Sequence, residues 1–165
     1  MLDQLEREAC SRDLLLRLQV GRPLGLWSLR LVAARCSEER LQLPGEMKAW
    51  AYGRSGGLQL DTLRVLPGAP AGCADLIWAA TMAWALEATP CRRARLLAIR
   101  DDERQHRRLV RYFQAKGFQS VREVQAALLD LPLRMVWGGA GELMVGDCAV
   151  VLEGALGRWR AQAAA

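Results

Sequence analysis

The sequence has little histidine and no clustered cysteine, and each shortage excludes a class of site. His106 is the single histidine in 165 residues. Sites built on several histidines are therefore excluded, and a serine–histidine–acid triad would depend on this one residue. The five cysteines are scattered singly, and no two have the spacing of metal ligands. We expect no metal site, and reduced thiols in a cytoplasmic protein.

The N-terminus lacks the apolar core of a signal peptide. Residues 66–89 are apolar for nearly the length of a bilayer span, but Asp75, Glu87 and several prolines argue against one. A helix that is apolar on most faces is also required for packing between a sheet and a further layer. We therefore expect no membrane partner.

The composition is that of a folded chain, with 52% hydrophobic and 25% charged residues. Its length predicts one domain covering residues 1–165. The net charge of +5 comes mostly from arginine. Such a surface suits anionic ligands, although a well-solvated basic surface explains it equally well.

One central unit stands out between residues 58 and 118. The pattern predicts a strand over 58–65, a glycine-bearing turn over 67–72 and a long apolar helix over 73–89. A second strand over 94–100 and a charged helix over 102–118, stopped by Gly117, follow. Strands joined by a crossover of helical length are typical of neighbouring parallel strands.

The remaining segments are assigned from shorter patterns. Before the central unit we expect a helix over 2–19, a strand over 25–35, a turn at Pro44–Gly45, a strand over 47–53 and a hairpin loop over 54–57. After it we expect a strand-like start to 119–131, strands over 132–139 and 141–156, and a frayed tail from Gly157.

The turn before the long helix has the chemistry of an anion site. The amides of the first helical turn have no intrahelical partners and lie at the positive end of the helix. Small residues at Gly72 and Ala74 permit close backbone approach. The backbone amides that we expect to bind the anion are those of Gly72, Cys73, Ala74, Asp75 and Leu76. The Asp75 side chain opposes an anion there, and we interpret it as a residue that stabilises the start of the helix.

Two motifs in this unit make the chain resemble the GNAT N-acetyltransferase superfamily. In that family a turn of the form Gln/Arg-x-x-Gly-x-Gly/Ala binds the pyrophosphate of acetyl-CoA, and residues 69–74 read Ala-Pro-Ala-Gly-Cys-Ala. The family's helix Asn-x-x-Ala-x-x-x-Tyr-x-x-x-Gly-Phe corresponds to residues 106–118, from His106 to Gly117–Phe118. The resemblance covers about residues 58–124. It implies an α/β fold with a central mixed sheet of about six strands and helices on both faces.

The resemblance also implies an activity: transfer of an acetyl or other acyl group from CoA to a primary amine. Ala69 replaces the family's Gln/Arg, so weaker CoA binding is expected unless another arginine (Arg64, Arg104, Arg107 or Arg108) supplies the missing donor. Phe113 replaces the family's tyrosine, which protonates the leaving thiolate. The neighbouring Tyr112 is then the candidate acid, although adjacent helical side chains point about 100° apart.

The remaining site residues are assigned along the same unit. Asp61, the acid of the strand 58–65, is the candidate base, and an exposed strand residue without a role is the alternative. Backbone groups from Leu63 to Val65 would bind the pantetheine arm. The resemblance implies that His106 and Phe113 could contact the pantetheine or thiol, and for His106 the alternative is an exposed helix residue among arginines. Trp50 and Trp137 could line an acceptor cleft, although core packing is the simpler interpretation.

Two other functions stay open. The chain could be a GNAT-like pseudoenzyme that binds CoA or acts as a scaffold, because the Gln/Arg and the tyrosine are both replaced. It could also bind nucleic acid through the arginines between Arg92 and Arg111, but Asp101, Asp102 and Glu103 interrupt them and no aromatic stacking platform accompanies them. The acceptor amine is not readable, and a homodimer is left open.

Overall fold

A computed structural model describes residues 1–37, 40–124 and 139–162 of the chain. Its elements are α1 (Leu2–Cys10), β1 (Leu15–Gly21), the short 3-10 helix η1 (Pro23–Gly25), β2 (Trp27–Ser37), β3 (Arg40–Ala51), β4 (Leu58–Val65), α2 (Cys73–Ala88), β5 (Arg93–Ile99), α3 (Glu103–Ala115), β6 (Phe118–Val124), β7 (Gly141–Asp147) and α5 (Cys148–Ala161). The mixed α/β class expected from the sequence is confirmed. The central unit is also confirmed, as β4, α2, β5 and α3 in that order.

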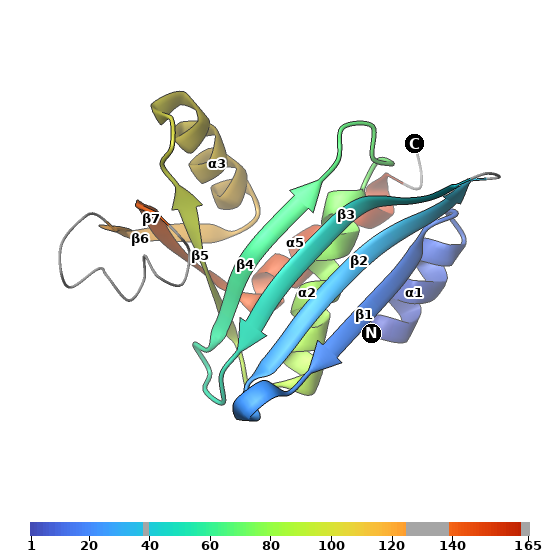
Figure 1. The fold of residues 1–165 in the computed structure, drawn as a ribbon, viewed down its shortest axis with the longest axis horizontal. Helices are drawn as coiled ribbons and strands as arrows, with labels where there is room; N and C mark the ends of the chain where they lie inside the picture. Colours follow the sequence, from blue (N-terminus) through green and yellow to red (C-terminus); the bar gives the residue numbers. More distant parts are fainter. Residues whose placement is uncertain (38–39, 125–138, 163–165) are drawn as a thin grey trace.

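The strands of the described residues form one seven-stranded sheet in the order β1-β2-β3-β4-β5-β7-β6, one strand more than expected. Every neighbouring pair is antiparallel except β4 and β5, which are parallel. Strands β1–β4 form a broad surface, and β5 with α3 diverges from it (Figure 1).

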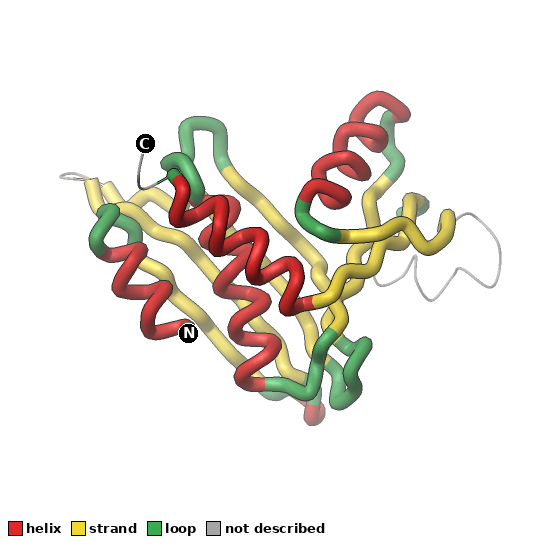
Figure 2. Tube along the Cα trace, turned by 180° about the vertical axis from the view of Figure 1, so that it is seen from behind, coloured by secondary structure: helices red, strands yellow, loops and turns green. Residues whose placement is uncertain are grey.

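The helices do not cover both faces of β1–β4 as expected. Of the described helices, α1, α2 and α5 lie over these strands on the same face (Figure 2), and the opposite face is open in Figure 1. Helix α3 packs against the same helical layer, where the Trp78 indole of α2 donates a hydrogen bond to Tyr112 of α3. None of the helices in the described part of the chain is long and apolar enough to cross a membrane.

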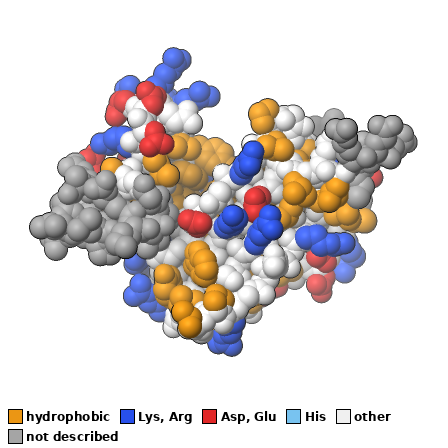
Figure 3. All heavy atoms as spheres, viewed as in Figure 1, with side chains coloured by type: hydrophobic (Ala, Val, Ile, Leu, Met, Phe, Trp, Pro, Cys, Tyr) orange, Lys and Arg blue, Asp and Glu red, His pale blue; other side chains and the backbone are white. Residues whose placement is uncertain are grey.

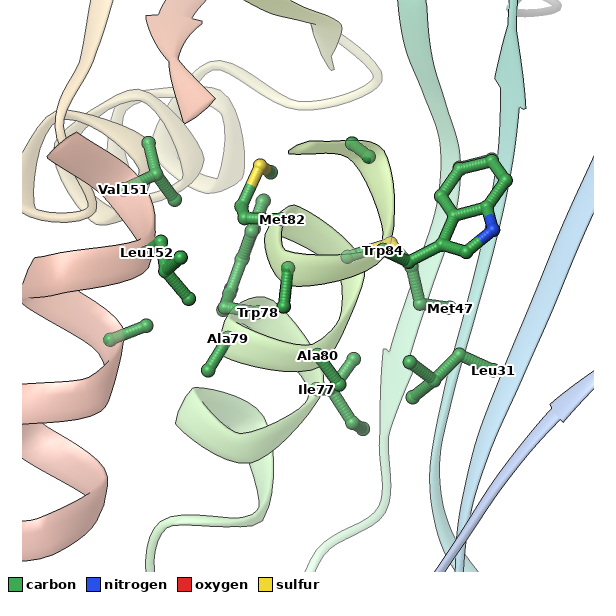
Figure 4. Packing of buried hydrophobic residues seen from close by; sticks show 14 of the residues in the cluster. Leu31, Met47, Ile77, Trp78, Ala79, Ala80, Met82, Trp84, Val151 and Leu152 are labelled. Atoms are coloured by element: carbon green, nitrogen blue, oxygen red, sulfur yellow. The ribbon is translucent and has the colours of Figure 1, made fainter. Parts of the chain in front are cut away.

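The core is centred on α2, whose residues from Leu76 to Ala85 are all buried. Figure 4 shows α2 between the strands that carry Leu31 and Met47 and the helix α5 that carries Val151 and Leu152. Burial on two sides explains why this helix is apolar around its whole circumference. Close approach to the sheet also requires Gly45, because a Cβ atom there would collide with Ile77 of α2.

Two expectations for the first third of the chain are wrong. Residues 2–19 are not one helix: α1 ends at Cys10, Asp13 adopts a positive φ of 56°, and β1 begins at Leu15. The leucine-rich stretch from Leu14 suits a strand as well, because Leu14 and Leu16 are buried on one side of it. Pro44–Gly45 is not a turn, since β3 continues through it from Arg40 to Ala51.

The largest error lies at the C-terminus. The expected strand over 141–156 ends at Asp147, and the helix α5 runs from Cys148 to Ala161. The tail is not frayed from Gly157, because Trp159 is fully buried within α5. The expected strand over 132–139 lies almost wholly outside the described residues.

Candidate functional site

The most unusual feature of the sheet is the separation of its two parallel strands. Strands β4 and β5 pair only at Leu58–Ala94 and Gln59–Arg95. Beyond this point β4 stays paired with β3, and β5 stays paired with β7. The two facing edges therefore diverge toward the C-terminal ends of both strands. Figure 3 shows the surface hollowed here, between α3 and the end of β4.

Asp61 lies just beyond the point where the strands part. The register between β3 and β4 shifts between the pairs Ala49–Leu60 and Lys48–Thr62, so Asp61 is the extra residue of a β-bulge. Bulges re-aim side chains and often occur next to active sites. Asp61 is exposed and borders a shallow hollow of about 270 Å³ on the open face of the sheet, together with Trp50. Trp50 is thus not a core residue, and is 40% exposed.

The turn after β4 ends at Gly72, the N-cap of α2. Its φ of 78° lies in the left-handed region that favours glycine. A Cβ atom at Gly72 would lie 2.6 Å from Gln162 Oε1 and 2.8 Å from Trp159 Cε3. The space beside this glycine is therefore filled by the end of α5. Packing against α5 supplies a reason for glycine that the sequence argument, based on ligand approach, did not contain.

The first turn of α2 offers fewer amides than the sequence suggested. The Cys73 amide donates to Pro70 O at 3.0 Å, and the Leu76 amide donates to Gly72 O at 2.8 Å. The amides of Gly72, Ala74 and Asp75 have no hydrogen-bond acceptor among the described residues. No side chain of residues 1–37, 40–124 or 139–162 caps this helix. Three donors thus remain at the positive end of α2.

The carboxylate of Asp75 is buried next to these amides. Its Oδ1 accepts from Lys116 Nζ at 2.6 Å and from Arg158 Nε at 2.8 Å. The side chains of Asp75 and Lys116 are only 8% and 9% exposed. Two cations therefore share one carboxylate, and Arg158 Nη2 is buried with no partner among the described residues. This arrangement leaves a positive charge and a spare donor beside the N-terminus of α2.

Tyr112 and Phe113 pack in the contact between α2 and α3. Tyr112 Oη accepts from Trp78 Nε1 at 3.0 Å, and no described residue accepts its own hydroxyl proton. Burial raises the pKa of Tyr112, so the phenol stays protonated at neutral pH. Phe113 contacts the rings of Trp78 and Phe118.

Other residues predicted for the site lie in ordinary structural positions. His106 is 3% exposed, with Nδ1 3.3 Å from Ile99 O and Nε2 3.6 Å from Glu142, between the end of β5 and β7. Leu63 packs partly against the core. Val65 is exposed at the end of β4. Burial raises the pKa of the Cys73 thiol to about 11, which makes it unreactive at neutral pH.

The predicted residues therefore form two groups rather than one. Residues 72–76 lie near Tyr112 in the helical layer, whereas Asp61 lies on the open face of the sheet. Sequence reasoning missed Lys116 and Arg158, which hold Asp75. Arg158 falls in a segment taken for a frayed tail, and no local pattern links it to a residue 83 positions away.

Comparison with known proteins identifies the fold through solved structures. No model of a known protein family matches the chain, and no curated protein matches it. Solved structures do match. One is assigned to the GNAT family of acetyltransferases and comes from Desulfovibrio desulfuricans, with 13% identity, a TM-score of 0.50 and coverage of 73% of this chain and 69% of that one. The chain has the GNAT fold.

Two further structures with this fold are similar to a comparable extent. A chimera of the spermidine N-acetyltransferase SpeG from Vibrio cholerae and hSSAT has 11% identity, a TM-score of 0.51 and coverage of 76% of this chain and 69% of that one. Nourseothricin acetyltransferase has 13% identity, a TM-score of 0.51 and coverage of 81% and 84%. Identities this low establish the GNAT fold alone, and activity must be argued from the site.

Proposed function

We propose that this chain is an N-acyltransferase that uses acetyl-CoA, or another acyl-CoA, to acylate a primary amine. The observation that carries the proposal is the separation of β4 and β5 directly beside the uncapped N-terminus of α2. An extended ligand with a diphosphate needs a strand edge for its chain, a helix N-terminus for its phosphates and a hollow to lie in. These three features lie next to one another here.

The diphosphate is assigned to the first turn of α2. The free amides of Gly72, Ala74 and Asp75 would donate to it, in the positive field of the helix. The positive charge that remains on Lys116 and Arg158 supports the same assignment, as does the unpartnered Arg158 Nη2. Arg158 thus supplies the hydrogen-bond donor that the family's Gln/Arg provides and that Ala69 cannot.

The pantetheine arm is assigned to the part of β4 that no longer pairs with β5. Leu63 and Val65 lie on this stretch, where the side chains of β4 change from buried to largely exposed. Backbone groups of a strand edge can bind an amide-containing chain and polarise the acyl carbonyl.

Positioning and two proton transfers complete the proposed reaction. The neutral amine attacks the thioester carbonyl carbon, an amide bond forms and the carbon–sulfur bond breaks. Asp61 accepts the proton that the amine loses, directly or through water. Tyr112 is the proposed donor to the leaving thiolate, because its hydroxyl proton is not engaged by a described residue. These roles require substrate to reach both sides of the gap between the strands.

A CoA-binding pseudoenzyme is the second candidate, and one observation favours it. The Asp75 carboxylate already occupies Lys116 and Arg158, and Trp78 bonds to Tyr112 across the α2–α3 contact. A ligand would have to share or displace these interactions. Such a protein would bind CoA without transferring its acyl group.

Thermal unfolding in the presence of acetyl-CoA tests the proposal, followed by an assay of CoA release with a panel of primary amines. A ligand that prefers the folded state raises the melting temperature, so we expect stabilisation by acetyl-CoA and CoA but not by adenosine. Asp61→Asn should keep this stabilisation and lower transfer by about 10²–10⁴-fold, the usual contribution of a general base. Stabilisation without transfer to any amine would favour the pseudoenzyme, and no stabilisation would contradict both.

A further inference from the structure

A further cavity lies away from the α2 site. It holds about 770 Å³ on the part of the sheet formed by β5, β7 and β6, near the N-terminal end of β5. Arg93 and Arg95 line it, with the hydroxyls of Ser55 and Ser120. The two arginines alternate with the core residue Ala94, so both lie on the face opposite α2.

Arg95 is unusual among the arginines. Three described arginines are half-buried: Arg12, Arg95 and Arg158. Arg12 donates to Trp159 O, and Arg158 donates to Asp75. Arg95 has no hydrogen bond or ion pair with any of the described residues. Its nitrogens are not among the buried unsatisfied atoms, so they reach water from the cavity and are available to an anionic ligand.

The cavity is built on anchored backbone. The amides of Arg92 and Arg93 both donate to Ser55 O, at 2.7 and 2.9 Å, and fix the β3–β4 loop against β5. The one described acid in the lining, Asp147, is engaged as the N-cap of α5, where its Oδ1 accepts from the amides of Ala149 and Val150. Its charge offsets that of Arg93, the register partner of Asp147, so the lining keeps a net positive charge through Arg95.

A second unpartnered polar group adjoins Arg95. Gln59 is the register partner of Arg95 at the last pair before β4 and β5 separate, so both side chains lie on the same face. Gln59 is 9% exposed, and its Oε1 is buried without a hydrogen-bond partner in the described part of the chain. An unused acceptor thus lies next to an unused cation, at the vertex of the gap between the strands.

We propose that this cavity and vertex bind an amine that also carries an anionic group, a carboxylate or a phosphate. Arg95 and Arg93 hold the anionic group. Gln59, which lies beside the lining, must turn its side chain toward the cavity for Oε1 to accept from the ligand's N–H. The anion site is independent of the function proposed above. The identification of its ligand as the acyl acceptor rests on that function.

The first test uses inorganic phosphate, titrated at constant ionic strength and followed by thermal unfolding and calorimetry. Arg95→Gln should lower the affinity for phosphate about tenfold to a hundredfold, the effect of losing a charged hydrogen bond. Arg7→Gln is the matched control, because Arg7 is exposed on α1 and its substitution removes the same charge. Equal affinity in the wild type and Arg95→Gln, or no binding by the wild type, would overturn the anion site.

The second test compares β-alanine with propylamine as acceptors, two primary amines of equal length that differ in the carboxylate. Transfer to β-alanine should be faster in the wild type, and Arg95→Gln should remove this preference while leaving CoA binding unchanged. Equal rates in the wild type would overturn the acceptor assignment and leave the transferase in place. Phosphate binding that depends on Arg95, without transfer to either amine, would retain the anion site and contradict the proposed function.

Discussion

At the scale of single residues, position 72 requires glycine for two reasons, and the contribution of each to stability can be measured separately. Its positive φ disfavours any other residue, and its missing Cβ makes room for Trp159 and Gln162. Gly68 offers a matched control, because its φ is 79° but no atom of the described residues lies within 4 Å of an added Cβ.

We predict that Gly68→Ala lowers the free energy of unfolding by about 1–2 kcal/mol, the cost of a left-handed backbone. Gly72→Ala should cost about 1–3 kcal/mol more, because the added methyl group overpacks the contact with α5. Urea unfolding of the two variants measures the difference. Equal losses would show that α5 does not pack against Gly72.

Contacts between single residues are also what the sequence predicts least well. It places Asp75 at the start of a helix, and the structure confirms this. It cannot show that the carboxylate is buried between Lys116 and Arg158, because these residues lie 41 and 83 positions further along the chain. Only the fold brings the three together.

At the scale of elements, the sequence predicts those whose pattern is distinctive. The long apolar run of α2 and the charged helix α3 with its terminal glycine match the structure closely. Helix α5 does not, because Ala-Val-Val-Leu suits a strand as well as a helix. Asp147, whose side chain caps α5, and the spacing of the buried residues Val151, Ala155 and Trp159 are the signals that would have identified it.

The docking of α5 on α1 should depend on pH through Glu8. This carboxylate accepts from Trp159 Nε1 at 3.1 Å and from Arg160 Nη2 at 2.9 Å. Burial raises the pKa of Glu8, but Arg160, Gln4 and Trp159 outweigh it and hold that pKa below the ordinary value of 4.5. The stabilisation is therefore complete above pH 4.5 and is lost as the pH falls through the lowered pKa.

Comparison of the wild type with Glu8→Gln measures this contribution. The wild type should be the more stable protein at pH 7, and its advantage should shrink steadily below pH 4.5. Urea unfolding at a series of pH values is the measurement. An advantage that stays constant down to pH 3 would mean that Glu8 contributes through its shape and not through its charge.

At the scale of the whole molecule, the account depends on two neighbouring features: a sheet that opens between its parallel strands, and a helix that begins uncapped beside the opening. The strand–turn–helix–strand order was predictable from local patterns. The separation of the strands was not, because pairing between β4 and β5 ends with no change in their strand character. The open face of β1–β4 was likewise not encoded in any single segment.

The most direct test of the central claim is calorimetric titration of CoA into wild type, Ala74→Glu and Ala74→Gln. Residue 74 lies half-buried in the first turn of α2, where a carboxylate stabilises the helix but repels a diphosphate. We predict that both variants fold and bind CoA more weakly than the wild type because of their bulk, and that Ala74→Glu binds at least about tenfold more weakly than Ala74→Gln, which has the same shape without the charge. Equal affinity of the two variants, or of all three proteins, would contradict binding of the diphosphate at this helix N-terminus.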